Sequence, residues 1–431
     1  MVRGDEVGRC LPAFFIVNLE SKEKIMTNNI EAYDAKFLAN EAFNKFVQSL
    51  GFAKKVYRGY EQDWKVFGQG DTINIRKPSR FVAQDHVPGV GTNSQDLDTS
   101  KVSIGLDFHK EVRFSITDRE LVKANVAGET GKDSNRLIRD HILPAANALA
   151  AAVDQDLAKL SRQIPWTYDI SGEMGPGVIT NPRGIMRKNG VPLEDGNVNF
   201  AIDPELENQF LQMPVFHSAA IVGGVGNNDA LVKGSLGCRF NTNLFVNQSL
   251  PEHSAGAVVT GSDHSGLLDG AHSKGATSLA IAGFANGASV KAGDVLHIAG
   301  QVQPYAVIAD AVLDNGGGIV RITPALNAAI GDGTVVSFEN ASTEGCNAGH
   351  YATNLMFHQN AFALVVAPLA EISDGRGADV SVIRDPDSGL SMRSRIWFDG
   401  ATATTHGALD ILDGIAVVDP NLAVKVRRKL A

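Results

Sequence analysis

KVSIGLDFHKEVRFSI, residues 101–116, is the most informative stretch of this chain. Apolar residues occupy one parity of the stretch and mostly polar residues occupy the other, which is the period-2 pattern of a long β-strand with one apolar face. The apolar positions are Val102, Ile104, Leu106, Phe108, Val112, Phe114 and Ile116. At a rise of about 3.3 Å per residue such a strand spans about 50 Å, more than an average strand in a compact domain.

A shorter run, TINIR at residues 72–76, precedes this strand across a loop rich in Pro, Gly and Asp. Together they predict an extended hairpin within residues 64–120. A two-stranded ribbon alone is marginal in water, so something outside it must cover its apolar face. We expect another copy of the same protein to provide that cover. The predicted intersubunit contact consists of Val102, Ile104, Leu106, Phe108, Val112 and Phe114.

Composition indicates an ordinary soluble protein. The 431 residues are enough for two or three domains, with 44% hydrophobic and 20% charged residues. The net charge of -9 gives no overall indication of a nucleic-acid-binding surface. Cys10, Cys238 and Cys346 are far apart, which favours a reducing compartment without a disulfide framework. The apolar runs are too short to span a bilayer, so we expect no membrane contact.

Two segments precede the hairpin. Residues 1–25 differ in character from the rest, and Met26 resembles a second start, so we interpret 1–25 as an upstream extension or, alternatively, a mobile arm. Residues 26–63 form the predicted N-terminal arm, where apolar residues at helical spacing between 30 and 57 indicate an amphipathic helix or helix pair.

A long helix is predicted over residues 131–165, with Asp133 and Ser134 as candidate N-caps. Pro144 should kink this helix or mark the start of its regular part. A short helix at 182–188, a strand at 198–202 and a helix at 204–211 follow. These elements begin a mixed core that comprises residues 166–252 and 346–431.

Residues 253–345 interrupt that core. Charged residues thin out there, and short β-prone runs alternate with Gly-Asp and Asn-Gly turns. The runs are 278–281, 295–298, 306–308, 319–322 and 335–338. This pattern predicts a small barrel or sandwich inserted as its own domain. Beyond it we expect a helix leading into a strand at 354–367, and strands at 390–398, 408–412 and 424–426.

No pattern in the sequence indicates catalytic, cofactor-binding or metal-binding residues. The phosphate-loop-like run at 128–134 lacks its first glycine, and the run GSDHS at 261–265 places triad residue types too close together for triad geometry. His253, His264 and His272 match no metal-ligand spacing.

Three basic clusters are also present: Arg76, Lys77 and Arg80 in the hairpin loop, Arg393 and Arg395 on one strand face, and the basic residues at 425–429. They are interpreted either as solvated faces and a solubilising tail or as contacts with acidic partners or a nucleic-acid backbone.

The order of these elements resembles the major capsid proteins of tailed bacteriophages with the HK97-like fold, and within them the phage P22 coat protein family. Local motifs carry the resemblance across residues 26–427: NGVP at 189–192 with AIDPE at 201–205, GSLGCRF at 234–240 with NQSLP at 247–251, KAGDVLHIAG at 291–300, NLMFHQNAFAL at 354–364, GLSMR at 389–393 and LDILDG at 409–414. Each motif alone is degenerate, and the ordered set is what resembles the family.

The resemblance implies an α+β fold with an N-terminal arm, an E-loop hairpin, a spine helix, A and P domains and an inserted β-barrel-like domain. It implies a major capsid protein that self-assembles as hexamers and pentamers into an icosahedral shell. It also implies a scaffolding protein, a portal protein, a possible decoration protein and non-specific contact with packaged double-stranded DNA, with assembly in the host cytoplasm and a final location in the virion.

Two alternatives stay open at this stage. One is an encapsulin-like bacterial compartment with the same fold, against which the inserted domain argues. The other is a carbohydrate-active enzyme with an accessory β-domain, which would need paired acids in an aromatic cleft. Trp64, Trp166 and Trp397 are too scattered in sequence to suggest such a cleft.

Overall fold

A computed structural model describes most of the chain. The described residues are 35–58, 72–76, 83, 85, 101–117, 119, 141–170, 174–213, 216, 234–261, 264–339, 349–370, 378–385 and 389–430. The expectations for residues 1–25, Lys77, Arg80 and the helix cap at Asp133 lie outside these residues. The backbone of Arg76 is described, but its side chain is not.

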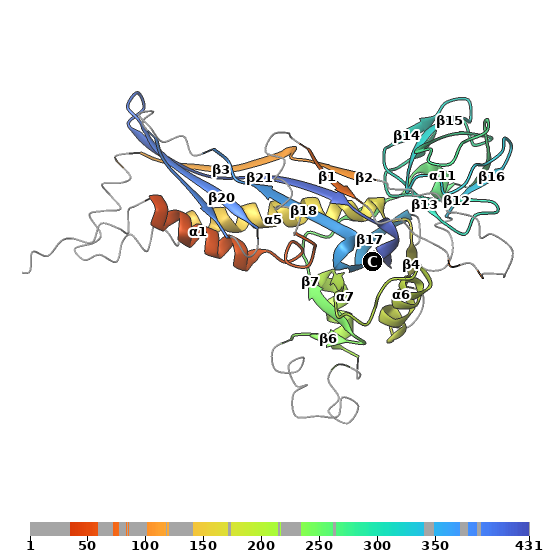
Figure 1. Ribbon diagram of the computed structural model, residues 1–431, viewed down its shortest axis with the longest axis horizontal. Helices are drawn as coiled ribbons and strands as arrows, with labels where there is room; N and C mark the ends of the chain where they lie inside the picture. The colour runs from red at the N-terminus through yellow and green to blue at the C-terminus, as the bar shows by residue number, and fades with distance from the viewer. Residues whose placement is uncertain are drawn as a thin grey trace, which may run out of the picture.

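The described chain is elongated, with a long sheet and two helices toward one end and a barrel at the other (Figure 1). The long sheet has the strand order β18-β21-β20-β19, with β3 paired to β21. The elements of this part are α1 (Ala35–Ser49), β1 (Thr72–Arg76), β2 (Lys101–Gly105), β3 (Phe108–Thr117), α5 (Leu143–Lys159), a 3-10 turn (Leu160–Gln163), β18 (Phe362–Ala367), β19 (Ala378–Arg384), β20 (Ser391–Asp399) and β21 (Thr404–Val417).

The predicted single strand at 101–116 is wrong, because the chain divides it at Leu106 and Asp107. The first half, β2, pairs with β1 and forms the expected hairpin, whereas β3 leaves that hairpin and pairs with β21 over ten positions. The second half is therefore one strand of a larger sheet in the same chain and not part of an isolated ribbon.

The apolar face of the stretch is covered mainly from within the chain. Ile104 packs against β18 and Val418, with Val102 and Leu106 beside it, whereas Val112 and Phe114 pack against the main core. Phe108 is 39% exposed. Burial thus differs along this face: Ile104 is fully buried within the chain, whereas Val102, Leu106, Val112 and Phe114 are only partly buried. The chain itself covers much of the face, and the contact with a neighbouring copy stays a prediction.

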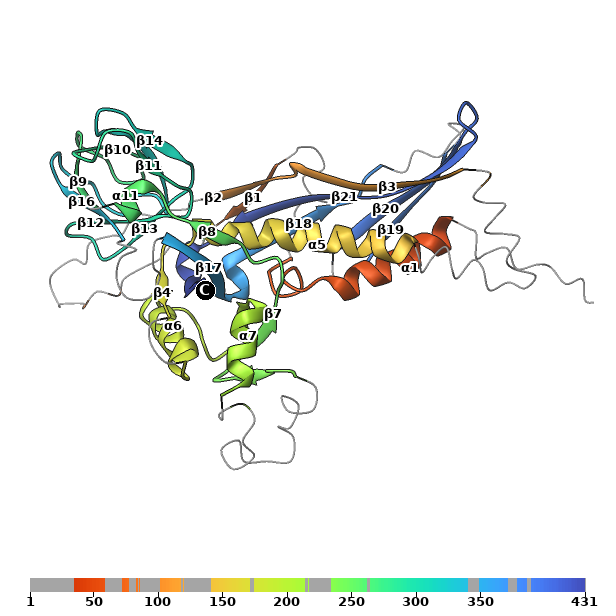
Figure 2. The ribbon, with the colours of Figure 1, turned by 180° about the vertical axis from the view of Figure 1, so that it is seen from behind.

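Helices α1 and α5 cover one face of the long sheet, and hairpin β1-β2 covers part of the other (Figures 1 and 2). Helix α5 begins at Leu143 with Pro144 in its first turn, so the proline marks the start of the regular helix. Asp154 on α5 accepts hydrogen bonds from the backbone N–H groups of 51, 52 and 53 at 2.7, 3.1 and 3.0 Å, which fixes the segment after α1. Phe52 then stacks on Phe357 with ring centroids 4.8 Å apart.

A second sheet, ordered β4-β22-β17-β5-β7-β6 with β8 paired to β17, forms the centre of the molecule. Its elements are β4 (Thr167–Asp169), α6 (Gly177–Lys188), β5 (Val198–Ile202), α7 (Pro204–Leu211), β6 (Cys238–Arg239), β7 (Thr242–Val246), β8 (Glu252–Ser254), β17 (His350–His358), two 3-10 turns (Gln359–Ala361 and Pro420–Leu422) and β22 (Ala423–Lys429). Strand β5 and helix α7 have the predicted bounds, and α6 extends the short helix expected at 182–188.

Of the helix and following strand predicted for 354–367, the strand is present as β18, but the helix is wrong. This run forms the end of β17, a 3-10 turn and β18, because its apolar side chains are buried on both faces of their strands and leave no polar stripe for a helix to present to water.

Residues 265–338 contain a closed barrel with the strand order β10-β15-β13-β12-β16-β9. The strands of this region are β9 (Ser265–Leu268), β10 (Ser278–Ala282), β11 (Ala288–Val290), β12 (Val295–Ile298), β13 (Tyr305–Val307), β14 (Ala311–Leu313), β15 (Gly318–Thr323) and β16 (Val335–Phe338), with helix α11 (Ala257–Thr260) leading into them. The barrel has its own apolar core around the fully buried Tyr305 and Leu279. Strands β12 and β16 have the predicted bounds.

Candidate functional site: the junction between barrel and core

The barrel joins the central sheet through a cluster of buried charged side chains, which we call the junction. Strand β8 leads into the barrel and β17 leads out of it, and the two strands pair with each other at Ser254 and His350. The backbone therefore enters and leaves the barrel at neighbouring positions. Side chains from both parts meet beside this crossing.

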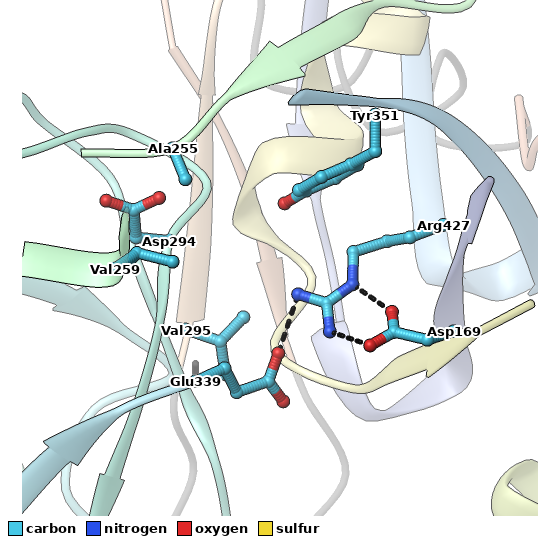
Figure 3. A pocket seen from close by; sticks show the side chains of 8 residues that line it. All are labelled: Asp169, Ala255, Val259, Asp294, Val295, Glu339, Tyr351 and Arg427. Atoms are coloured by element: carbon cyan, nitrogen blue, oxygen red, sulfur yellow. Dashed lines mark hydrogen bonds and ion pairs between the residues drawn. The ribbon is translucent and has the colours of Figure 1, made fainter. Parts of the chain in front are cut away.

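Arg427 is the central cation of the junction (Figure 3). It projects from β22 and forms a two-point ion pair with Asp169 of β4, in which Nη2 lies 2.8 Å from Oδ2. Its Nη1 lies 2.7 Å from a carboxylate oxygen of Glu339, which follows the last barrel strand. Arg427 thus connects the core to the barrel by a charge-assisted contact in a largely buried setting.

Glu339 has further partners in both parts. Its carboxylate accepts a hydrogen bond from Thr167 Oγ1 at 2.6 Å and lies 3.3 Å from Nε2 of His297 on β12. Burial alone would raise the pKa of Glu339, but the charge of Arg427 and these hydrogen bonds lower it to about 2. The carboxylate is therefore ionised at neutral pH and contributes to the attachment of the barrel.

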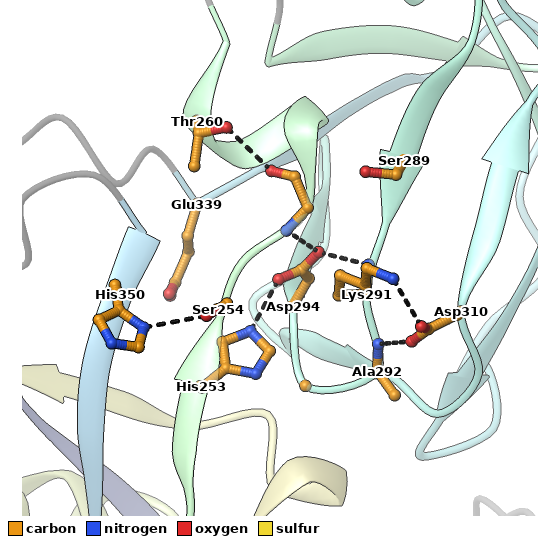
Figure 4. Close-up of polar contacts among 12 residues, drawn as sticks. His253, Ser254, Thr260, Ser289, Lys291, Ala292, Asp294, Asp310, Glu339 and His350 are labelled. Atoms are coloured by element: carbon orange, nitrogen blue, oxygen red, sulfur yellow. Dashed lines mark hydrogen bonds and ion pairs between the residues drawn. The ribbon is translucent and has the colours of Figure 1, made fainter.

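Asp294 makes a second connection, at the start of β12 (Figure 4). Its carboxylate lies 3.0 Å from Nε2 of His253 on β8 and accepts the backbone N–H groups of Gly256 at 3.1 Å and Lys291 at 2.7 Å. These contacts fix the turn at 291–294 against the strand that leads into the barrel.

Lys425 makes the third connection. It lies two residues before Arg427 on β22, so both side chains project to the same face. Its Nζ donates a hydrogen bond to the backbone carbonyl of Gly293 in the barrel turn at 2.8 Å. The side chain is buried, with only 2% of the residue exposed.

The space at the junction is small. The cavity lined by Arg427, Glu339 and Tyr351 measures about 10 Å³, which is room for about one water molecule. Among the described residues, no group of three or more His, Cys, Asp or Glu side chains could hold a metal ion. No helix in the described part of the chain is long and apolar enough to cross a membrane.

Two of the predicted basic clusters lie in the described part of the chain, and their side chains have different partners. Arg393 and Arg395 share one sheet face, as expected, but both pair with the buried Asp410, at 2.6 and 3.1 Å. The interpretation of 425–429 as a solvated tail is wrong for most of the segment, because β22 lies between β4 and β17, and Arg427 and Arg428 pair with core carboxylates. His253 belongs to the junction through Asp294.

Comparisons with known proteins give only distant similarity. The chain matches no protein-family model and no curated protein sequence. It is similar to a solved structure from Mycobacterium phage Che8, at 15% identity over 88% of this chain and 90% of that one, with a TM-score of 0.45. It is similar to the capsid structure of cyanophage P-SCSP1u, at 12% identity over 84% of each chain, with a TM-score of 0.42.

A third similarity is to a virus-like particle from Pyrococcus furiosus, at 8% identity over 90% of this chain and 97% of that one, with a TM-score of 0.36. Sequence identities and TM-scores this low are too weak to assign a function, so we infer one from the chain's own sequence and geometry.

Proposed function

We propose that this chain is a shell-forming structural protein, the major capsid protein of a tailed double-stranded DNA bacteriophage. One observation carries the proposal: a single chain exposes large apolar side chains at several separated places. They are Phe108 and Phe398 on the long sheet, Phe240 in the turn between β6 and β7, and Leu267, Val302, Ile308, Val312, Ile319 and Val335 on or beside the barrel strands.

The long sheet and the barrel lie toward opposite ends of the chain (Figure 2). One partner of ordinary size cannot cover side chains so far apart, because a standard interface buries only about 800 Å² on each side. Several neighbours can, if each contacts the exposed apolar side chains of one region. A closed shell gives each subunit several neighbours, whereas an enzyme would need a pocket larger than the cavities seen at the junction.

The ordered sequence motifs support the finer parts of the proposal. By resemblance to the P22 coat protein family, the chain assembles in the host cytoplasm around a scaffolding protein, expands as DNA is packaged and ends in the virion. A portal protein and a decoration protein are further proposed partners. Of the hairpin residues first expected at the intersubunit contact, Phe108 is the one we now propose to reach a neighbour. Arg76, Lys77 and Arg80 are proposed to contact an acidic partner or DNA.

Electron microscopy tests the proposal. The purified chain, expressed with and without a candidate scaffolding protein, should form closed shells of hexamers and pentamers. Shells that form without a scaffold and enclose a cargo enzyme would favour the compartment alternative. A monodisperse monomer or small oligomer under both conditions would overturn the proposal.

Two phenylalanine variants test the contact itself. Phe108→Ala should reduce shell yield and leave the urea midpoint of the unassembled chain unchanged, because this ring is partly exposed. The matched change Phe114→Ala should lower that midpoint, because its ring packs against the main core. An unchanged shell yield for Phe108→Ala would show that this ring does not contribute to the interface.

A further inference from the structure

Lys425 has an unusual setting for a lysine. Its amine is buried between the central sheet and the barrel, and among the described residues no carboxylate forms an ion pair with it. Within the part of the chain that the structure describes, its hydrogen-bond acceptor is the Gly293 carbonyl of the barrel turn. An ammonium group in such a place has lost most of its hydration without gaining a counter-ion in contact.

The basic groups around it make the charged form less favourable still. Arg427 projects from the same strand face, and Arg162 and His253 line the small cavity on which Lys425 opens. That cavity also contains the hydroxyl of Ser161, which is fully buried and has no hydrogen-bond partner among the described residues. Among these groups, the charge of Arg427 is the one that disfavours protonated Lys425.

Acidic groups surround the same amine at longer range. Asp169 of β4, Asp294 of the barrel turn and Glu339 after β16 attract the charged form, and Glu252 of β8 lines the same cavity. Tyr351 completes the cavity wall. Burial, followed by the charge of Arg427, outweighs these carboxylates and lowers the pKa of Lys425 from 10.5 to about 7.

We propose that Lys425 makes the junction a pH-sensitive joint, in which the neutral amine holds the barrel against the core and the protonated amine favours a more open arrangement. The proposal does not depend on the proposed capsid function. It follows from the position of the amine, because separation of the Gly293 turn from β22 is what would return Lys425 to water.

The direction follows from linkage. The closed state has the lowered pKa, so between pH 7 and 10.5 the open state binds more protons than the closed state. The free-energy cost of closing the junction over the protonated amine is therefore fully present below pH 7, and it disappears as the pH rises toward 10.5. With these two values, the ratio of open to closed junction should fall about 50-fold between pH 7 and pH 9.

Two neighbouring groups change charge outside this pH range. Glu339, with its pKa lowered to about 2, changes charge at lower pH. Burial raises the pKa of Tyr351 above its usual value, so this phenol loses its proton only at higher pH. A His253→Asn variant measures separately how much of the pH dependence of junction opening comes from the His253 imidazole.

Hydrogen exchange of the full-length chain tests the proposal. Opening is followed by mass spectrometry in peptides covering 289–298 and 420–430, after correction for base-catalysed exchange. The wild type should show the 50-fold decrease from pH 7 to pH 9, and Lys425→Met should abolish it. The control Lys159→Met, at a lysine that is largely exposed and pairs with Asp156, should retain it. A wild type without this change, or a Lys425→Met variant that retains it, would overturn the proposal.

A second measurement avoids dependence on the folding of the methionine variant. In protein labelled at lysine Cε, the Lys425 resonance is identified by its loss in Lys425→Arg. It should titrate near pH 7. A midpoint near 10.5 would overturn the proposal.

Discussion

Glu339→Gln should weaken the attachment of the barrel by about 3 kcal/mol at pH 7. This magnitude follows from the pKa of Glu339, which falls from 4.5 in the unfolded chain to about 2 in the junction, at about 1.4 kcal/mol per pH unit. The side chain is only 19% exposed, so solvent screening removes little of this value. Arg427 keeps its pairing with Asp169 in the variant, which prevents the larger loss expected for an unpaired buried cation.

The pH dependence of this loss is the sharper test. A carboxylate with a lowered pKa contributes its full stabilisation above the unfolded pKa of 4.5 and loses it as the pH falls toward 2. The difference between wild type and Glu339→Gln should therefore shrink from about 3 kcal/mol at pH 7 to about 1.5 kcal/mol at pH 3. Urea unfolding of the unassembled chain measures it, with Trp166 as a fluorescent reporter because its carbonyl accepts the Lys425 backbone N–H.

Glu252→Gln is the matched control. This glutamate lies at the same crossing but is 62% exposed and only 3.8 Å from His350, so its removal should change the free energy of unfolding by less than about 0.5 kcal/mol. Equal losses of stability in the two variants at pH 7 would refute a specific role for Glu339. An equal loss for Glu339→Gln at pH 7 and pH 3 would show that the loss comes from packing and not from charge.

Two further predictions concern the packing of the long sheet. Asp154→Ala should lower the free energy of unfolding by about 3 kcal/mol in urea titrations, because three backbone N–H groups lose their acceptor, and Asp154→Asn, which keeps one acceptor oxygen, should lose less. Equal losses in the two variants would contradict this account. Gly414→Ala should cost about 2 kcal/mol in the same assay, because its Cβ would overlap the Gly105 carbonyl oxygen and lie 3.0 Å from Ile104 Cγ2 where β2 crosses β21. Gly400→Ala, whose Cβ would meet its nearest atom at 4.0 Å, is the control, and a comparable loss there would refute the explanation by crowding.

The local sequence pattern predicted a helix or strand correctly where that element depends only on its own residues. Helix α7 begins at Pro204 because proline suits the first turn, and β12 and β16 follow from short apolar runs between turns. Periodicity did not reveal the break at Leu106 and Asp107, because the alternation continues on both sides while the partner strand changes from β1 to β21. A change of partner leaves no local signal.

The junction was missed for the same physical reason. Lys425 and Arg427 alternate with valines in β22, a pattern typical of a strand with one solvated face. Their burial depends on a barrel inserted between β8 and β17 and on Asp169, which lies 258 positions earlier in the chain. The sequence signal available was the presence of two cations on one strand parity together with isolated acids at 169, 294 and 339.

The pairing of Ser254 with His350 has a consequence for how such a chain can change over evolutionary time. Because the two ends of the inserted segment are already neighbours in an antiparallel ladder, a short turn could join them and leave the central sheet continuous. The segment can thus be lost, gained or exchanged as a module without a change in the path of the host chain. Such an exchange would change the electrostatics of the junction, because the present module supplies Glu339 as a second acid for Arg427 and the Gly293 carbonyl as an acceptor for Lys425. A replacement module would have to provide equivalent partners, or Lys425 would have to change with it.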